Sequence, residues 1–500
     1  MLLPLLLALA QTAPEPLHLI VLHTNDVHGQ ALARPATWLP EPGRSVGGLE
    51  RLLVAIEAVR AEARASGAEV LLLDGGDWFQ GTPEGALEGG VPFCKLLARL
   101  GYDALALGNH EFDLGLPPLE HLLKQTGIQP LCANLARREL DGSLSRPAWV
   151  DPVRLFQRGG LDIAVVGLLT PSTPYISHPD SRSLLFEPPE QALARVRAEL
   201  PAGIELILAL THLGVEDDNQ LAQAAPDLPL IVGGHSHTFL REGVRQGRTL
   251  IVQAGSKAGA LGRVDLRLER PSGRVLEQRS RLIDLDQPPP EGALPADFAA
   301  ELANLVERAS ASLGEVVAEL VDAGPAADRF RSGGLGNWLA DAFRRRSGAD
   351  VAIHNRGGIR KSLAAGPLTR RDLFEVMPFD NTLVVLELSG AELEAVLRRA
   401  LAGKERANLE FSGLLIEFRF DGEGRSQFVR AWHDGLPLDP ERRYRLATNS
   451  FLARGGDRLL QELGERGFED SGLLIREVLE LEAEAAGRIF FPPENRYLQR

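Results

Sequence analysis

Five short segments in the first half of the chain carry side chains that bind metal ions, and each follows directly on an apolar run. Carboxylate, imidazole and amide oxygen together are the ligands that suit zinc, manganese or iron(II). Because ligand sites in open α/β sheets gather outside the carboxyl ends of the strands, we expect the five loops to converge on one point. The segments are residues 23–28, 74–77, 108–113, 211–214 and 233–237.

The spacing inside these segments supports one shared task. Asp26 and His28 are two residues apart, as are His235 and His237, so each pair lies on one side of an extended chain. A lone aspartate after a strand is usually a helix cap, and a lone histidine is usually a satisfied surface or core residue. Five such loops within one domain are very hard to explain as caps. The sequence therefore predicts a metal centre.

Alternating apolar runs of strand and helix length must position these loops. Leu49, Leu52, Ile56 and Val59 recur at helical spacing and predict a helix over residues 49–65. Strand-length runs on both sides of this helix predict a layered α/β domain. The expected strands are residues 17–23, 69–73, 103–107, 163–168, 205–210 and 228–232.

The chain is too long for one hydrophobic core, since single cores usually stop growing near about 250–300 residues. With 500 residues, two domains are expected. The hydrophobic repeat fades after Leu285, and Gln287 is followed by three prolines, which can continue neither a strand ladder nor a helix. We expect a first domain over residues 17–286, a linker with a connecting helix near 298–311 over residues 287–313, and a second α/β domain over residues 314–500.

The first ten residues are apolar and end in Ala8-Leu9-Ala10, which is typical of a secretory signal. We expect residues 1–12 to be a signal peptide and the mature protein to be periplasmic or secreted; the alternative is a frayed apolar N-terminus. No later stretch reaches the ~18 apolar residues of a membrane span, so no stable membrane insertion is expected. The two cysteines, Cys94 and Cys132, allow at most one disulfide and exclude a cysteine-based zinc site.

The net charge of −14 argues against a nucleic-acid partner, because nothing supplies the basic face that neutralises a polyphosphate backbone. A small anionic substrate would need local cations, which metals and a few arginines can provide. In the second half, Asn355 to Arg360 follow an apolar strand at residues 350–353. The glycines of this loop allow a close backbone approach, and Arg360 can meet a phosphate with its planar fork.

Taken together, these motifs resemble the 5′-nucleotidase family over nearly the whole chain after the leader. The resemblance implies an α/β protein of two domains. The first is a calcineurin-like metallophosphoesterase domain, a four-layer α/β sandwich, and the second is an α/β nucleotide-binding domain joined to it by a linker helix. The motifs, in the family's order, are Asn25-Asp26-x-His28, Gly76-Asp77, Gly108-Asn109-His110-Glu111-Phe112-Asp113, Thr211-His212 and Gly234-His235-Ser236-His237.

The resemblance also implies two divalent metal ions per chain, with zinc, manganese or cobalt as candidates. Asp77 would bridge them. Two ions about 3.5–4 Å apart can hold a phosphate and generate hydroxide near neutral pH. The implied ligands are Asp26, His28, Asp77 and His237 at one ion, and Asp77, Asn109, His212 and His235 at the other.

Further roles follow from the resemblance. His110 is similar to the family's catalytic histidine and Asp113 to its orienting partner, although an aspartate here could also cap the next helix. Arg329 and Arg360 would bind phosphate. Phe379 and Phe451 would sandwich the base, and each would otherwise be read as a core residue. The implied substrate-binding residues are Arg329, Asn355, Arg360, Phe379, Phe451 and Asp457.

The leading hypothesis is a 5′-nucleotidase that converts nucleoside monophosphates to nucleoside and phosphate by attack of a metal-activated hydroxide. A close alternative is a hydrolase of 2′,3′-cyclic nucleotides, UDP-sugars or nucleoside di- and triphosphates, which the same metal centre permits. A non-catalytic nucleotide-binding protein would be expected to have lost metal ligands, and here all the motifs keep theirs. We expect a monomer or weak dimer.

Overall fold

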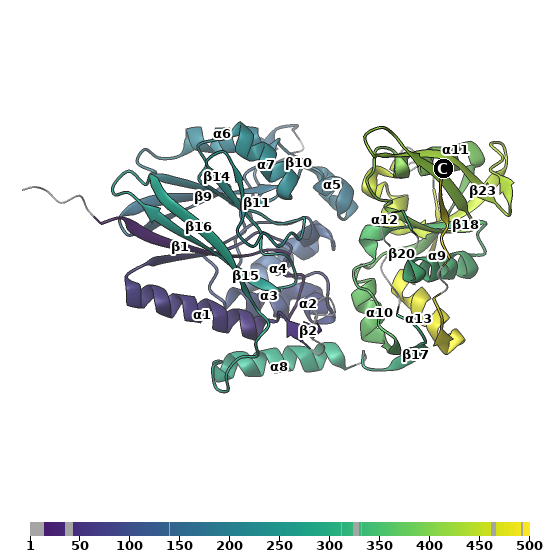
Figure 1. Ribbon diagram of the computed structural model, residues 1–500, viewed down its shortest axis with the longest axis horizontal. Coiled ribbons are helices and arrows are strands. Elements are labelled where there is room, and N and C mark those ends of the chain that lie inside the picture. The colour runs from purple at the N-terminus through teal and green to yellow at the C-terminus, as the bar shows by residue number, and fades with distance from the viewer. Residues whose placement is uncertain are drawn as a thin grey trace, which may run out of the picture.

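The computed structural model describes residues 15–35, 44–139, 141–311, 313–323, 330–331, 333–461, 467–491 and 494–500. The expected signal peptide and Arg329 lie outside these residues. The chain forms two lobes that lie side by side, one coloured purple to teal and the other green to yellow (Figure 1). Helix α8 (Ala296–Ser310) runs along the first lobe and leads into the second. Within the described residues, no helix is both long and apolar enough to span a bilayer.

The first lobe contains two mixed sheets. The first has the order β16-β15-β1-β4-β5, with β1, β4 and β5 parallel to one another. The second has the order β13-β14-β12-β11-β9-β8, with a parallel centre of β14, β12, β11 and β9. Their strands are β1 (Leu17–Thr24), β4 (Glu69–Asp74), β5 (Ala104–Leu105), β15 (Ala260–Leu268), β16 (Val275–Asp284), β8 (Val153–Arg158), β9 (Leu161–Leu169), β11 (Leu206–His212), β12 (Leu230–Val232), β13 (Val244–Gln246) and β14 (Thr249–Val252).

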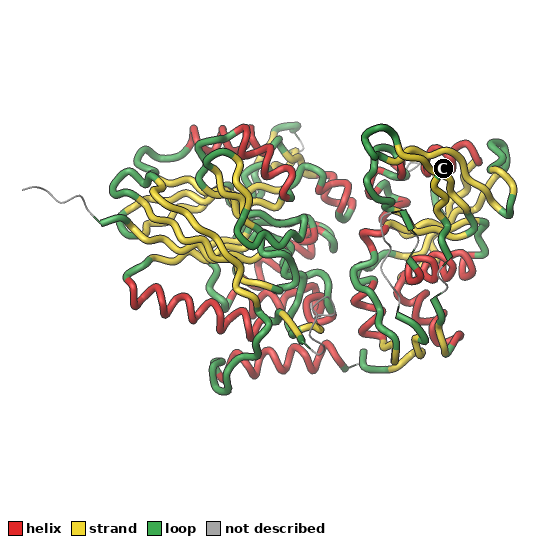
Figure 2. The backbone as a smooth tube through the Cα atoms, in the orientation of Figure 1, coloured by secondary structure: helices red, strands yellow, loops and turns green. Residues whose placement is uncertain are grey.

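The two sheets pack face to face and helices cover both outer faces, which makes four layers (Figure 2). Leu19 and Val21 of β1 meet Val165 and Leu208 of the second sheet in the central layer. The presence of apolar side chains on both faces of β1 reflects this burial on two sides. The covering helices are α1 (Leu49–Ser66), α3 (Val91–Ala98) and α4 (Leu116–Thr126) on the first sheet, and α6 (Pro189–Glu199) and α7 (Val215–Ala224) on the second.

The expected helix over residues 49–65 is α1, whose buried face contains the leucines and isoleucine that set its spacing. Gly67 ends it in the left-handed conformation that favours glycine. The expected strand over residues 103–107 is only two residues long. Ala106 still donates to the backbone oxygen of Asp74 in β4 and also pairs with Leu131, and Leu107 donates to Leu131 alone. Small elements of this lobe are β2 (Arg34–Pro35), β3 (Ser45–Val46), β6 (Leu135–Arg138), β7 (Leu144–Ser145), β10 (Leu184–Phe186), α2 (Pro83–Ala86) and α5 (Thr173–Ile176).

The second lobe is built on a five-stranded sheet of order β21-β18-β25-β20-β26. Helices α9 and α13 cover one face of it, while α11 and a four-stranded sheet cover the other. The elements are α9 (Gly334–Ser347), α10 (Arg370–Val376), α11 (Gly390–Leu401), α12 (Ser450–Ala453), α13 (Ile475–Ala486), β17 (Val316–Leu320), β18 (Val351–Asn355), β19 (Gly366–Thr369), β20 (Thr382–Ser389), β21 (Leu409–Ser412), β22 (Leu415–Phe420), β23 (Ser426–His433), β24 (Leu436–Pro437), β25 (Arg443–Asn449), β26 (Glu469–Leu474), β27 (Arg488–Ile489) and β28 (Tyr497–Gln499).

Direct contacts join the lobes. Gln80 donates a hydrogen bond of 3.0 Å to the backbone oxygen of Pro378. The guanidinium of Arg371 lies 2.6 Å from the carboxylate of Glu84.

Both cysteines, Cys94 and Cys132, are buried and free.

Candidate active site

The five loops expected to bind metal ions converge where the parallel strands of both sheets end. The loop after β1 carries Asp26, and the loop after β4 carries Asp77. His212 is the last residue of β11. The loops of the two sheets contact one another: Nδ1 of His212 lies 2.6 Å from the backbone oxygen of Gly75, and the N–H of His235 donates to Asp26 at 2.9 Å. All seven residues expected to bind metal come together there.

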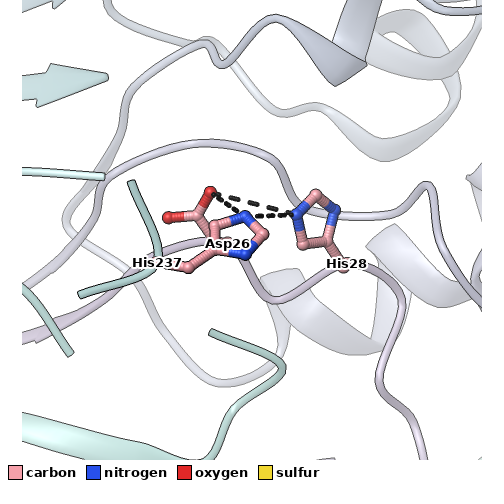
Figure 3. A group of neighbouring side chains, drawn as sticks. All are labelled: Asp26, His28 and His237. Atoms are coloured by element: carbon pink, nitrogen blue, oxygen red, sulfur yellow. Dashed lines mark hydrogen bonds and ion pairs between the residues drawn. The ribbon is translucent and has the colours of Figure 1, made fainter. Parts of the chain in front are cut away.

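The first group consists of Asp26, His28 and His237, whose side chains point toward one another (Figure 3). The Nε2 atoms of the two histidines lie 3.1 Å apart. Nε2 of His237 is also 3.1 Å from Oδ1 of Asp26. His237 lies at the rim, with 32% of its side chain exposed, while the other two are buried.

The second group lies beside the first and consists of Asp77, Asn109, His212 and His235. Oδ2 of Asp77 is 3.1 Å from Nε2 of His212 and 3.9 Å from Nε2 of His28. Nδ1 of His235 is 2.9 Å from Oδ1 of Asn109. Asp77 therefore lies between the two groups.

The tautomers of the buried histidines fit a cation. Nδ1 of His28 donates to the backbone oxygen of Gln80 at 2.9 Å, and Nδ1 of His212 donates to that of Gly75 at 2.6 Å. Since a carbonyl oxygen only accepts, each ring carries a hydrogen on Nδ1 and directs Nε2 toward the centre. A hydrogen bond from the outer ring nitrogen orients metal-binding histidines in the same way. Burial lowers the pKa of His28 well below its usual value and lowers that of His235 to about 4. The rings of His28 and His235 are therefore neutral at pH 7, whereas at His212 the carboxylate of Asp77 outweighs burial and raises the pKa to about 10.

The backbone at the metal-binding residues is unusual. Five of the seven have positive φ angles, a region that non-glycine residues rarely adopt. Such conformations persist only where the surroundings over-determine them, and they cluster at functional sites. The residues are Asp26 (φ 51°), His28 (49°), Asp77 (62°), His235 (76°) and His237 (54°).

His110 lies beside this centre and is paired with Asp113. Nδ1 of His110 is 2.6 Å from Oδ2 of Asp113. Burial opposes protonation of the ring, but the carboxylates of Asp113 and Asp77 outweigh it and raise the pKa of His110. Asp113 therefore contacts the imidazole of His110 and does not cap helix α4, whose N-cap residue is Gly115.

A cavity of about 530 Å³ lies between the lobes and is lined by both. From the first lobe it is lined by Asn109, His110, Asp113 and His235. The second lobe contributes all the expected substrate-binding residues that the structure describes. These are Asn355, Arg360, Phe379, Phe451 and Asp457.

Two of these residues reach across the cavity to the metal-binding side. The ring of Phe379 stacks on that of His110 with centroids 5.5 Å apart and planes 16° apart. An Nη atom of Arg360 lies 3.3 Å from Nε2 of His28, and its guanidinium lies over the Phe379 ring. The second lobe therefore presents a cation directly to the metal-binding residues.

Comparison with known proteins gives consistent matches across both lobes. Residues 19–239 match the calcineurin-like phosphoesterase family, and residues 315–463 match the 5′-nucleotidase C-terminal domain. The 5′-nucleotidase of Vibrio cholerae is 30% identical, and the alignment covers 95% of this chain and 91% of the relative. Protein UshA of Escherichia coli is 29% identical over 94% of this chain and 92% of its own length. The crystal structure of a 5′-nucleotidase precursor from Thermus thermophilus superposes with a TM-score of 0.84 and 30% identity, covering 96% of this chain and 99% of that one.

This chain belongs to the 5′-nucleotidase family. The expected two-domain α/β fold with a four-layer first domain is confirmed. The enzyme class, a metal-dependent phosphoric monoester hydrolase, follows from the family and from its phosphoesterase domain. Calcineurin-like phosphoesterases use divalent metals, and the grouped side chains offer sites for them.

Sequence reasoning missed the buried polar residues that hold the metal-binding loops of this 5′-nucleotidase-family protein. The carboxylate of Glu111 accepts hydrogen bonds from the backbone N–H groups of Asp77, Trp78 and Gly108, at 3.0, 2.7 and 2.7 Å. Asn25 donates to the carboxylate of Asp26 at 2.7 Å. Glu111 and Asn25 lie inside the motifs that carry the family resemblance. Their places beside the expected metal ligands were the signal that could have identified them.

Proposed function

We propose that this chain binds two divalent cations and hydrolyses nucleoside 5′-monophosphates to nucleoside and phosphate. One observation carries this proposal: one cavity is lined by Asn109 and His235 of the expected metal ligands, by His110, and by two aromatic rings, an arginine and a carboxylate of the second lobe. A phosphate ester of a nucleoside has a part for each of these groups.

The metal-binding residues divide between the two cations as the family resemblance implies, with Asp77 shared. Divalent ions at this site would bind phosphate oxygens and supply hydroxide near neutral pH. Arg360 would place its guanidinium on the same phosphate, because it lies 3.3 Å from His28 at the edge of the centre. This cation offsets charge that develops on the phosphate as the ester bond breaks.

His110 would act on the leaving oxygen. Its Nδ1 is bound to Asp113, so Nε2 carries the proton that an imidazolium can give. As the bond from phosphorus to the 5′ oxygen breaks, Nε2 donates this proton to the departing alkoxide. The raised pKa of His110 keeps more of the ring protonated near neutral pH.

The nucleoside would lie against the second lobe. Phe379 and Phe451 line the cavity and offer faces on which a base of any kind can stack. Asp457 opens on the same cavity, and enough protein surrounds its carboxyl to raise its pKa to about 6. Its carboxylate would accept hydrogen bonds from ribose hydroxyls. We further propose that the protein is exported and works as a monomer or weak dimer.

A phosphate-release panel tests the proposal directly. The purified chain is incubated with AMP, UMP, ATP, UDP-glucose and 2′,3′-cyclic AMP, each with zinc, manganese or cobalt. We expect the highest kcat/KM for the monophosphates with at least one of the metals. A preference for the cyclic diester, the sugar nucleotide or ATP would replace the proposed substrate by the corresponding alternative.

A further inference from the structure

Gln80 contacts both sides of the cleft through different parts of the same residue. Its backbone oxygen accepts a hydrogen bond of 2.9 Å from Nδ1 of His28 on the metal-binding side. The residue is 4% exposed, and Nε2 of its side chain donates a hydrogen bond of 3.0 Å to the backbone oxygen of Pro378 in the second lobe. Gln80 also lines the cavity between the lobes. It belongs neither to the metal-binding residues nor to the residues expected to bind substrate.

The segment around Gln80 is fastened to the loop that carries His28. The backbone N–H of His28 donates to the backbone oxygen of Asp77 at 3.0 Å. The hydroxyl of Thr82 donates to the backbone oxygen of Gly29 at 2.6 Å. Hydrogen bonds before and after Gln80 in the chain therefore fix its place relative to the metal-binding side.

Pro378 lies in a short segment of the second lobe that contacts two of the residues expected to bind substrate. The backbone N–H of Arg360 donates to the backbone oxygen of Val376 at 2.9 Å. Phe379 follows Pro378 directly in the chain. Pro378 is buried, so the carbonyl that Gln80 binds is enclosed by protein. A donor that fixes this carbonyl therefore acts on the very next residue, Phe379.

The direction of the Gln80 amide is set by its partner. A backbone oxygen only accepts, so the NH2 group must face Pro378 and Oε1 is at the other end. Oε1 is buried and has no hydrogen-bond partner among the described residues. An apolar side chain of similar length would fill the same space without a buried acceptor that lacks a partner. The amide is therefore explained by the hydrogen bond that it makes across the cleft, and not by packing.

We propose that Gln80 is a positioning residue that sets the place of Phe379 relative to the metal centre. A nucleoside monophosphate must reach both at once, with its phosphate at the metal centre and its base on the Phe379 ring. Because one residue holds both sides, the cost of ordering them when substrate binds is lowered. A small aryl phosphate needs only the metal centre. This inference rests on the proposed nucleotide substrate.

The test compares Gln80→Met with the wild type on AMP and on an aryl phosphate. Methionine keeps the length of the side chain and removes the donor, while the backbone oxygen that binds His28 is unchanged. We expect kcat/KM for AMP to fall about three- to tenfold, mainly through KM, as the loss of one hydrogen bond predicts. Aryl phosphate turnover should stay within about twofold of the wild type. Metal content measured by elemental analysis should equal that of the wild type.

The two rings of the nucleoside side provide a matched control. In a Phe379→Ala background, Gln80→Met should lower kcat/KM for AMP little further, because Gln80 acts through that ring. In a Phe451→Ala background the fall should persist, because Phe451 lies on α12, a different segment of the second lobe.

Each other outcome overturns the inference. An equal fall with the aryl phosphate would mean that Gln80 acts on Arg360 or on a metal ligand. No fall with AMP, or a full fall in the Phe379→Ala background, would mean that it does not act through Phe379. If the methionine variant is unstable in thermal unfolding, Gln80→Glu keeps the shape of the side chain without the donor, and its kcat/KM for AMP should fall relative to that for the aryl phosphate. Failure of the proposed function itself would be seen separately, as a wild type that does not hydrolyse AMP.

Discussion

The two sides of the cleft differ in how rigidly their residues are held. On the metal-binding side, Asp26, Asp77 and His212 are buried, and five of the seven residues hold backbone conformations that cost ~1–3 kcal/mol each. On the nucleoside side, Phe379 and Phe451 are half-buried, and Asp457 is exposed to the cavity. Cations need ligands fixed in space, whereas a stacking ring tolerates any base. The difference suggests that one side governs whether reaction occurs and the other governs which molecule reacts.

The strongest test of this division is Asp77→Asn. The change weakens both cation sites at once, so we expect phosphate release to fall by about three orders of magnitude or more. AMP and an aryl phosphate should fall together, since both need the metal centre. Chelation of the wild type should give the same loss, and metal content measured by elemental analysis should drop in both cases. If the chelated protein kept its untreated rate, the metal-binding side would not govern whether reaction occurs.

His110→Asn tests whether catalysis can be separated from metal binding on the same side. General acid catalysis contributes typically ~10²–10⁴-fold, so kcat for AMP should fall by that order. Metal content should remain near that of the wild type if His110 acts on the leaving oxygen, as proposed, and binds no ion. An aryl phosphate with a good leaving group should be less affected. Loss of one metal equivalent would instead place His110 among the ligands.

Removal of the two aromatic rings tests whether the second lobe governs which molecule reacts. Phe451→Ala together with Phe379→Ala should lower kcat/KM for AMP by about ten- to a hundredfold or more, given ~1–3 kcal/mol per stacking contact. Aryl phosphate turnover should change far less. The single change Phe451→Ala is the cleaner one, because Phe379 also stacks on His110. A parallel loss with both substrates after Phe451→Ala would show that this ring is a core residue.

The smallest expected effect is a pH dependence of binding. Asp457 faces the cleft, where desolvation by the surrounding protein raises its pKa to about 6, so its carboxylate is ionised above that pH and loses acceptor capacity below it. KM for AMP should rise about three- to tenfold as pH falls through 6. Asp457→Asn is the control, because the substrate phosphate titrates equally with both proteins and their ratio isolates Asp457. A ratio that does not change with pH would remove Asp457 from ribose recognition.

Folding stability should move in the opposite sense at this residue. The folded state holds the Asp457 proton more tightly than the unfolded chain does. Its favourable contribution is therefore complete below the unfolded pKa and is lost as pH rises through about 6. Asp457→Asn should stabilise the protein slightly at pH 8 relative to pH 5, measured as the difference in Tm.

Much of the first lobe could be predicted from the sequence because its strands are buried on both faces. The apolar run from Leu17 to His23 is typical of a central strand. The loop directly after it carries Asp26 and His28, whose side chains can be recognised in the sequence as metal-ligand types. The length of β5 could not be predicted, because Leu107 is as apolar as Leu105 and only the partner Leu131 decides which ladder it joins.

The candidate site could be predicted as a set of residue types, but not as a geometry. Positive φ angles at Asp26 or His28 leave no trace in residue type, since glycine stands at neither position. The partners of Glu111 are backbone N–H groups, which every residue except proline has. Asn449 lies in an apolar strand with no motif, and only the fold brings it beside His354 and Asn355.

The carboxylate of Glu111 has a consequence for how the enzyme can lose and regain its ions. It binds the backbone of Asp77 and of Gly108 at once, and so ties two loops from different strands together by hydrogen bonds alone. Because these hydrogen bonds are made within the polypeptide, we expect them to hold the two loops together when the cations are removed. Reconstitution of stripped protein should accordingly proceed at the rate of ion capture, with no slow refolding phase, and a chelated stock should regain full activity on simple dialysis against the metal.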